Sequence, residues 1–195
     1  MLLIEKIRCA WCSSDPLYQD YHDKEWGRVE KRDQRLFEML ILEGAQAGLS
    51  WITVLKKRQH YRKVFYNFKV NKVANMKDSE LELLLKDPGI IRNRLKVYGT
   101  RKNALAFIEV QKEFGTFSQY LWSFVDDEPI VNQCKSPNEM PAKTALSDKI
   151  AKDLKKRNFT FIGSTIIYAY LQATGVVNDH QTDCFCYEAC LTPSN

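Results

Sequence analysis

The sequence lacks any long apolar run. No segment approaches the roughly 20 consecutive apolar residues that a membrane-spanning helix needs. The segment Met1-Leu2-Leu3-Ile4 is too short for the apolar part of a secretory signal. The alternating pattern of β-strands and internal repeats are also missing. These absences favour an intracellular, mostly helical protein and argue against a membrane protein or a repeat array.

Histidine is scarce, and neither sign of charge dominates. The 195 residues include three histidines, and 29 Lys+Arg against 24 Asp+Glu give a net charge of +5. This mildly basic balance permits a polyanionic partner but does not establish one. With 45% hydrophobic residues, the chain can bury a core and suits one domain or two small lobes.

Apolar residues at helical spacing predict an all-α fold. Asp15 and Pro16 can begin a short helix, Asp33 or a neighbour caps a longer one, and Ser147 caps another. The basic outer side of the 50–65 segment, which includes Arg58, is expected to be solvated. Further helices are expected at about 70–76, 78–86, 90–114, 147–156 and 164–175. The polar segment 126–144 is expected to be the most mobile connection.

The stretch from Leu42 to Trp51 places a carboxylate at the inner end of an apolar helix. Glu43 follows a run of apolar residues, and two glycines and Trp51 come after it. A glutamate is rarely buried without a partner, so burial here would indicate a pocket. An exposed Glu43 on a helix that stops at Gly48 is the alternative, and this stretch alone does not exclude it.

A proline-glycine turn separates two predicted helices near the middle of the chain. Pro88 and Gly89 follow the 78–86 helix, and Ile90 begins a basic helix that reaches about Phe114. This is the pattern of a helix-hairpin-helix, in which backbone N–H groups at a helix start bind phosphate oxygens. An ordinary αα-hairpin is the alternative. Charge-assisted phosphate contacts would come from Arg92, Arg94 and Lys96.

Cysteine and histidine gather at both ends of the chain. In an intracellular protein six cysteines point to free thiols or a metal rather than to disulfides. A zinc ion bound by both ends would tie down the termini, and four protein ligands would make it structural rather than catalytic. Candidate ligands are His180 and Cys184, with three residues between them, together with Cys9 and His22; Cys12, Cys186 and Cys190 remain rivals on spacing alone.

Several motifs, spread in order from Cys9 to Tyr187, resemble those of one known family. They include Arg-Cys-Ala-Trp at 8–11, Tyr-His-Asp-Lys-Glu-Trp-Gly at 21–27, Leu-Glu-Gly-Ala-Gln-Ala-Gly-Leu-Ser-Trp at 42–51, Gly-Ile-Ile-Arg at 89–92 and Val-Asn-Asp-His at 177–180. In these motifs the chain resembles the bacterial 3-methyladenine DNA glycosylase I family of the helix-hairpin-helix superfamily. Ordered agreement over nearly the whole chain is more specific than any single motif.

The resemblance implies an all-α helix-hairpin-helix glycosylase fold. Residues 1–195 would form one unit of two helical lobes, with the helix-hairpin-helix at about 79–113. The segments 9–27 and 176–190 would be joined by one structural Zn²⁺ per chain. Its ligands would be Cys9, His22, His180 and Cys184, which leaves the other cysteines as bystanders.

The resemblance also implies an activity and a site. A bacterial cytoplasmic monomer, associated with the nucleoid through its DNA, would flip 3-methyladenine out of double-stranded DNA containing alkylated purines. It would release the base and leave an abasic site, without lyase activity. Glu43 and Tyr21 would be catalytic. The base pocket would contain Trp11, Tyr21, Trp26, Glu43 and Trp51, and the DNA backbone would contact Pro88, Gly89, Ile90, Arg92 and Arg94.

One alternative comes from a different functional class. A noncatalytic, zinc-containing helix-hairpin-helix protein that only binds DNA would explain the basic hairpin and the metal ligands. It would leave Glu43 and the four aromatic residues without a role.

Overall fold

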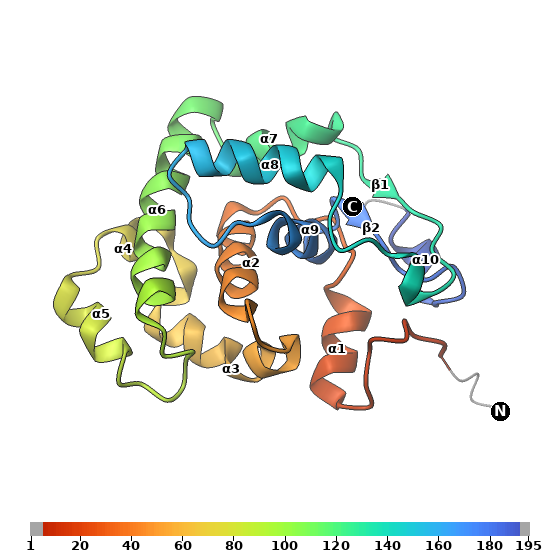
Figure 1. The fold of residues 1–195 in the computed structure, drawn as a ribbon, viewed down its shortest axis with the longest axis horizontal. Coiled ribbons are helices and arrows are strands. Elements are labelled where there is room, and N and C mark those ends of the chain that lie inside the picture. Colours follow the sequence, from red (N-terminus) through yellow and green to blue (C-terminus); the bar gives the residue numbers. More distant parts are fainter. Residues whose placement is uncertain (1–5, 192–195) are drawn as a thin grey trace.

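The computed structural model describes residues 6–191 and consists almost entirely of helices around a central one, α2 (Asp33–Gln46). In Figure 1, α6 stands to one side of α2, α7 and α8 lie above it, and α3 lies below. Residues 1–5 and 192–195 of the expected 1–195 unit lie outside the described residues. The other helices are α1 (Pro16–Lys24), α3 (Trp51–Val64), α4 (Val70–Ala74), α5 (Asp78–Leu84), α6 (Arg94–Phe114), α7 (Phe117–Trp122), α8 (Ala145–Lys156), α9 (Ser164–Ala173) and α10 (Cys186–Ala189), with 3₁₀ turns η1 (Tyr66–Phe68), η2 (Ser123–Val125) and η3 (Pro137–Glu139).

The central helix is buried on every side from Leu36 to Ala45. Leu36, Phe37 and Leu42 are fully buried, as expected of a helix enclosed by others. Two charged residues of the same helix, Glu38 and Glu43, are also buried. A helix in this position can deliver a side chain to the interior from a rigid support.

Three expected caps can be compared with the structure. Asp15 caps α1 as expected, accepting from the N–H of Leu17 at 3.0 Å. Asp33 does not cap α2, because its carboxylate accepts from backbone N–H groups of α7, 84 and 85 residues away. Ser147 is not the cap of α8 either: Thr144 is, and Ser147 completes its capping box.

The hairpin between α5 and α6 differs from the expectation at one boundary. The second helix begins at Arg94 rather than at Ile90. Asn93 is the reason, because its side chain accepts a hydrogen bond from the N–H of Lys96 at 3.1 Å and so caps the helix there. Ile90 precedes the helix and buries its side chain in the core.

Two short strands, absent from the sequence-based expectation, join distant segments. β1 (Ile130–Val131) pairs in parallel with β2 (Val177–Asn178). Strands of two residues carry no alternating pattern, so only the tertiary structure reveals them. The Thr182 N–H also donates to the Cys134 carbonyl at 3.0 Å. The connection 126–144 is therefore hydrogen-bonded to the C-terminal segment.

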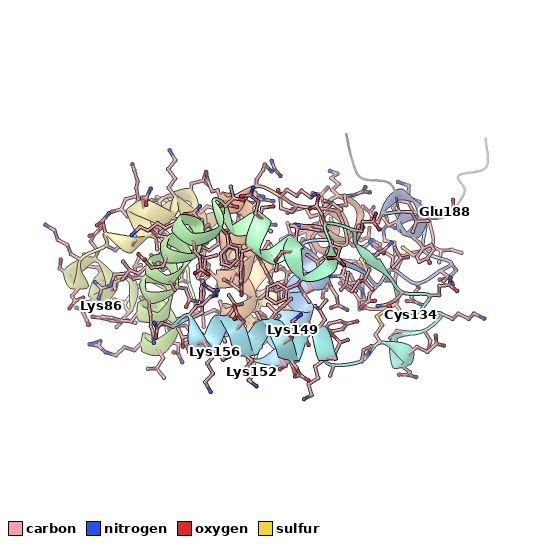
Figure 2. The ribbon with its side chains drawn as sticks, turned by 90° about the horizontal axis from the view of Figure 1, so that it is seen from above. Lys86, Cys134, Lys149, Lys152, Lys156 and Glu188 are labelled. Atoms are coloured by element: carbon pink, nitrogen blue, oxygen red, sulfur yellow. The ribbon has the colours of Figure 1, made fainter. Side chains whose placement is uncertain are left out.

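The N-terminal and C-terminal segments lie at the same end of the molecule, beside α1 and α10 (Figure 1). Figure 2 shows Glu188 at this end and Lys86 at the other, with Lys149, Lys152 and Lys156 along the outer side of α8. None of the helices formed within residues 6–191 has the length and apolar character needed to cross a membrane.

Candidate active site and metal centre

A cavity of about 180 Å³ opens where α1, α2, α3 and α9 meet. We call it the base cavity. It brings together all five residues expected in the pocket, from three segments of the sequence. Its lining consists of Trp11, Tyr18, Tyr21, Trp26, Glu43, Gln46, Trp51, Met140, Ala169 and Gln172.

Glu43 reaches the base cavity from the last turn of α2. Its relative exposure is 5%, so the alternative of a solvent-exposed glutamate is wrong. Burial raises the pKa of Glu43 to about 8, and the positive charge of Arg58 lowers it only in part. The carboxyl group is thus poorly solvated and will favour a cationic ligand that enters the cavity.

The aromatic residues form the other walls of the base cavity. The rings of Tyr21 and Trp51 lie 5.2 Å apart between centroids, and those of Trp11 and Trp26 lie 4.9 Å apart. The indole Nε1 atoms of Trp11 and Trp51 are buried without a hydrogen-bond partner among the described residues. Burial raises the pKa of the Tyr21 hydroxyl well above its ordinary value, so this residue stays neutral.

A buried ion network behind the cavity was not expected from the sequence. Arg58 was assigned to a solvated face, but its relative exposure is 4%. Its Nε donates to Glu38 at 2.6 Å, and its Nη1 donates to Glu25 at 2.9 Å. Arg35 contacts the same two carboxylates, each at 2.7 Å. The network ties the segment before Trp26 to α2 and α3.

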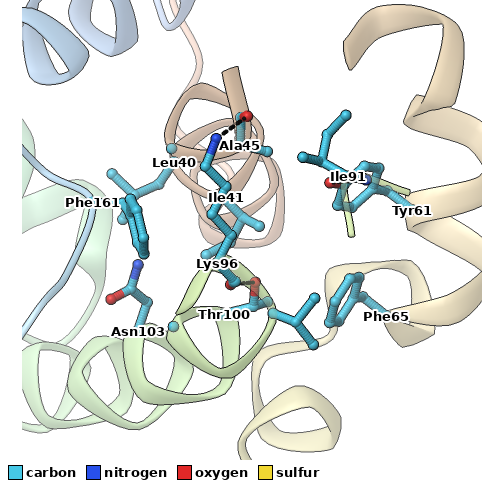
Figure 3. Close-up of a pocket in the computed structure, with 13 residues that line it drawn as sticks. Leu40, Ile41, Ala45, Tyr61, Phe65, Ile91, Lys96, Thr100, Asn103 and Phe161 are labelled. Atoms are coloured by element: carbon cyan, nitrogen blue, oxygen red, sulfur yellow. Dashed lines mark hydrogen bonds between the residues drawn. The ribbon is translucent and has the colours of Figure 1, made fainter. Parts of the chain in front are cut away.

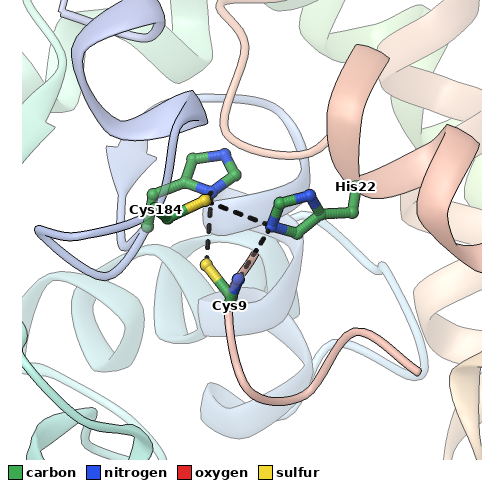
Figure 4. Close-up of side chains that lie close together, drawn as sticks. Cys9, His22 and Cys184 are labelled. Atoms are coloured by element: carbon green, nitrogen blue, oxygen red, sulfur yellow. Dashed lines mark hydrogen bonds between the residues drawn. The ribbon is translucent and has the colours of Figure 1, made fainter. Parts of the chain in front are cut away.

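Cys9, His22, His180 and Cys184 form a buried group that we call the Cys/His cluster. Their ligand atoms all lie within 4.8 Å of one another. Figure 4 shows Cys9 and His22 facing Cys184, from opposite ends of the chain. The Sγ–N distances from Cys9 to His180 and from Cys184 to both histidines are 3.3–3.5 Å. Tetrahedral zinc with ordinary bond lengths would set them at about 3.5 Å.

The outer contacts of the two histidines also suit a metal. His22 donates from Nδ1 to Asp23 at 2.9 Å, and His180 donates from Nε2 to the Trp26 carbonyl at 3.0 Å. Each histidine thereby turns its other ring nitrogen toward the sulfur atoms. Gly27 allows this approach, because a Cβ there would lie 2.8 Å from the His180 ring. The donor set fits a closed, structural zinc site. Rival cysteines Cys12, Cys186 and Cys190 are outside the group of four.

The Cys/His cluster lies directly behind the base cavity. The His180 and Trp26 rings are 4.6 Å apart between centroids, and the His22 and Trp11 rings are 5.2 Å apart. The two sites therefore share the segment that holds Trp11 and Trp26.

Pro88 and Gly89 lie in the turn between α5 and α6, and the polar groups of this turn are partly engaged within the protein. The N–H groups of Gly89 and Ile91 donate to Asp87 at 2.7 Å and to the Tyr61 hydroxyl at 3.0 Å. The Arg94 Nη1 and Nη2 atoms donate to the Glu82 carboxylate at 2.9 and 2.6 Å. Pro88, Arg92 and Arg94 are exposed. At the hairpin, phosphate would therefore meet arginine side chains more readily than the N–H groups of Gly89 and Ile91.

Five residues of the base cavity were missed in the sequence: Tyr18, Gln46, Met140, Ala169 and Gln172. Tyr18 could have been found, because it precedes Tyr21 by three positions and so lies on the same side of α1. Met140 comes from the 126–144 connection and Gln172 from α9, and no sequence signal links them to Glu43. Only the tertiary structure identifies these two.

The helical fold matches those of known 3-methyladenine DNA glycosylases. A crystal structure of 3-methyladenine DNA glycosylase I is 49% identical, with a TM-score of 0.91 over 93% of this chain and 100% of that one. Another, of a substituted 3-methyladenine DNA glycosylase I in complex with 3-methyladenine, is 33% identical, with a TM-score of 0.90 over 92% and 97%. The fold is therefore that of a helical DNA glycosylase.

Sequence comparison specifies the family. Residues 11–187 match the methyladenine glycosylase family. DNA-3-methyladenine glycosylase 1 of Escherichia coli (strain K12) is 49% identical over 180 residues, which cover 92% of this chain and 96% of that protein. A DNA-3-methyladenine glycosylase of Haemophilus influenzae is 47% identical over 179 residues, covering 92% and 97%. The chain belongs to the methyladenine glycosylase family.

Proposed function

We propose that this protein is a DNA glycosylase that releases 3-methyladenine from alkylated double-stranded DNA and leaves an abasic site. The observation that carries the proposal is the base cavity, whose lining combines buried Glu43 with the rings of Trp11, Tyr21, Trp26 and Trp51. Trp11 and Trp51, two of the lining residues, carry buried indole N–H groups that have no hydrogen-bond partner among the described residues. Membership of the methyladenine glycosylase family supports the same substrate.

The chemistry follows from the charge of the damaged base. 3-Methyladenine is cationic while attached to deoxyribose, so its glycosidic bond is already weak. An enzyme acting on it must flip it out of the duplex and hold it in a pocket. Indole and phenol faces attract a cation by about 0.5–2 kcal/mol per contact. The positive charge of the bound base favours the ionised form of Glu43, which then accepts hydrogen bonds from the exocyclic amine and balances the charge.

In this proposal Glu43 recognises the base and is not a strong general acid. The base leaves neutral, so it needs little protonation. Neutral Tyr21 shapes the cavity and supports the bound base against Trp51. A lyase step would need a lysine nucleophile in the cavity, and the lining formed by residues 6–191 includes none. This supports a monofunctional enzyme.

We propose that the α5–α6 hairpin acts as a helix-hairpin-helix that holds the DNA backbone. Exposed Arg92 and Arg94 would contact phosphates, with Arg94 exchanging Glu82 for DNA. Residues 1–195 would act as one monomeric unit of two helical lobes, on bacterial cytoplasmic DNA. The hairpin at about 79–113 would bind the backbone while the segments 9–27 and 176–190 support the cavity.

We further propose that the Cys/His cluster binds one structural Zn²⁺ per chain. Bound zinc would supply a rigid link between the two ends of the chain and no catalytic step. The residues it links hold Trp11 and Trp26 in the wall of the base cavity.

A base-release assay on methylated duplex DNA tests the function. We expect free 3-methyladenine to appear, with 7-methylguanine measured in the same reaction. Glu43→Gln should reduce release by at least about 100-fold, as is typical when a preorganised electrostatic group is removed. Its binding to a duplex with an abasic site should stay close to that of the unsubstituted protein.

Two results would contradict the proposal. DNA retarded in a gel without any released base would indicate the noncatalytic DNA-binding alternative. Equal loss of release and abasic-site binding in Glu43→Gln, with loss of helical circular dichroism, would make Glu43 structural.

A further inference from the structure

Lys96 connects the hairpin to the helix that carries Glu43. It lies in the first turn of α6, directly after the hairpin turn. Its Nζ donates to the Ala45 and Ala47 carbonyl oxygens, each at 2.8 Å. Figure 3 shows the side chain reaching from α6 to Ala45 at the end of α2. The last carbonyls of a helix have no partners within it, and a cation is favoured there.

These carbonyls belong to the residues on either side of Gln46, at the end of the helix that carries Glu43. Ala45 follows Glu43 by two positions, and Ala47 precedes Trp51 by four. Gln46, between the two alanines, itself lines the cavity. Movement of the last turn of α2 would displace both Glu43 and Gln46.

The hairpin turn is separately attached to α3. The Lys57 Nζ donates to the Pro88 carbonyl at 2.6 Å, and the Tyr61 hydroxyl accepts from the Ile91 N–H at 3.0 Å. The His60 ring lies so close to Gly89 that a Cβ there would be 2.2 Å from it. Since α3 begins at Trp51, the hairpin contacts the elements on both sides of the turn at 47–50.

We propose that Lys96 is a positioning residue that aligns Glu43 with a flipped base when the hairpin holds the DNA backbone. The inference rests on the proposed function and deepens it. Lys96 was expected to contact phosphate, but its ammonium group faces the carbonyls of α2 instead. Burial lowers the pKa of Lys96 from its ordinary value, consistent with a group turned inward. Its contribution is therefore to the geometry of excision and only weakly to affinity for DNA.

Lys96→Met tests this, because it keeps the length of the side chain and removes the ammonium group. We expect the single-turnover rate of 3-methyladenine release to fall about 10- to 100-fold, as for a small misplacement of a reacting group. The dissociation constant for an abasic-site duplex should stay near that of the unsubstituted protein. Lys96→Gln should likewise lower the rate and leave the dissociation constant unchanged. Lys96→Arg, which keeps charged donors, should recover part of the rate.

Lys102→Met is the matched control, since Lys102 is exposed on the same helix, and it should leave both quantities unchanged. An unaltered rate in Lys96→Met and Lys96→Gln would overturn the positioning role. Equal losses of rate and affinity would overturn it too and make Lys96 a phosphate contact. If the unsubstituted protein releases no base, the proposed function itself fails, so the two failures are distinguishable.

Discussion

Two buried glutamates of α2 differ in ionisation because of their neighbours. Burial alone would raise the pKa of Glu38, but the charges of Arg58, Arg35 and Arg62 outweigh it and hold that pKa below its ordinary value. Glu43, five positions later, has only the more distant charge of Arg58 to oppose burial, and its pKa rises to about 8. Glu38 is thus a satisfied structural ion, whereas Glu43 is available to a cation.

The raised pKa of Glu43 predicts a pH dependence of stability. Folding favours the protonated form of Glu43. The stability that comes from this preference is present in full below the ordinary pKa of about 4.3 and is lost as pH rises through the folded-state pKa of about 8. Glu43→Gln removes this loss. The variant should gain stability relative to the unsubstituted protein between pH 5 and 8, by up to about 1.4 kcal/mol per pH unit. Urea unfolding at several pH values measures this, and a difference independent of pH would contradict it.

At the scale of elements, long-range caps hold the helices together. Asp33, the first residue of α2, accepts from the N–H groups of Phe117 and Ser118, both at 2.9 Å, and from the Gln111 amide at 2.6 Å. One carboxylate therefore joins α2 to α6 and α7. A prediction from neighbouring residues makes an aspartate the cap of the helix that follows it in sequence. In the folded protein Asp33 instead caps α7, whose first N–H groups lie next to its carboxylate.

Asp33→Ala should consequently destabilise the protein. Removing a capping side chain costs roughly 0.5–2 kcal/mol, and we expect the upper end because two N–H groups of α7 lose their partner. Chemical denaturation should show a lower midpoint with an unchanged m-value. Asp20→Ala is the control, as Asp20 is about half exposed and, among residues 6–191, forms an ion pair only with Lys24 one turn away. A denaturation midpoint no lower than that of the control would contradict the stabilising role of Asp33.

At the scale of the whole molecule, the Cys/His cluster joins residues up to 175 positions apart, from Cys9 to Cys184. The β1–β2 pair reinforces the same end of the fold by joining the 126–144 connection to the C-terminal segment. The Cys/His cluster supports the base cavity from behind, where the His180 ring packs against Trp26.

Metal analysis and removal test the proposed zinc. Elemental analysis should find about one zinc per chain. Chelation, or Cys9→Ser, should lower the Tm by about 10 °C, since each kcal/mol lost moves the Tm of a domain of this size by roughly 2–4 °C. Cys12→Ser, outside the cluster, should keep both metal and Tm. Metal-free protein with full thermal stability would contradict a structural role.

The sequence by itself determined the helical class and the candidate metal ligands at both ends of the chain, and the family resemblance selected four of these ligands and supplied the five pocket residues. These are local or motif-level properties: helical spacing of apolar residues and the chemical types of rare side chains. The structure brings both predicted sets together. The roles of these residues stay predictions.

Only the tertiary structure decided how those residues are supported. The burial of Arg58, the reach of Asp33 to α7, the start of α6 at Arg94, and the attachment of Lys96 to α2 all depend on partners far away in sequence. A side chain's charge and spacing do not say which distant carbonyl or carboxylate it will meet, because packing of whole helices sets those distances. For the same reason Met140 and Gln172 became visible beside Glu43 only in the folded chain.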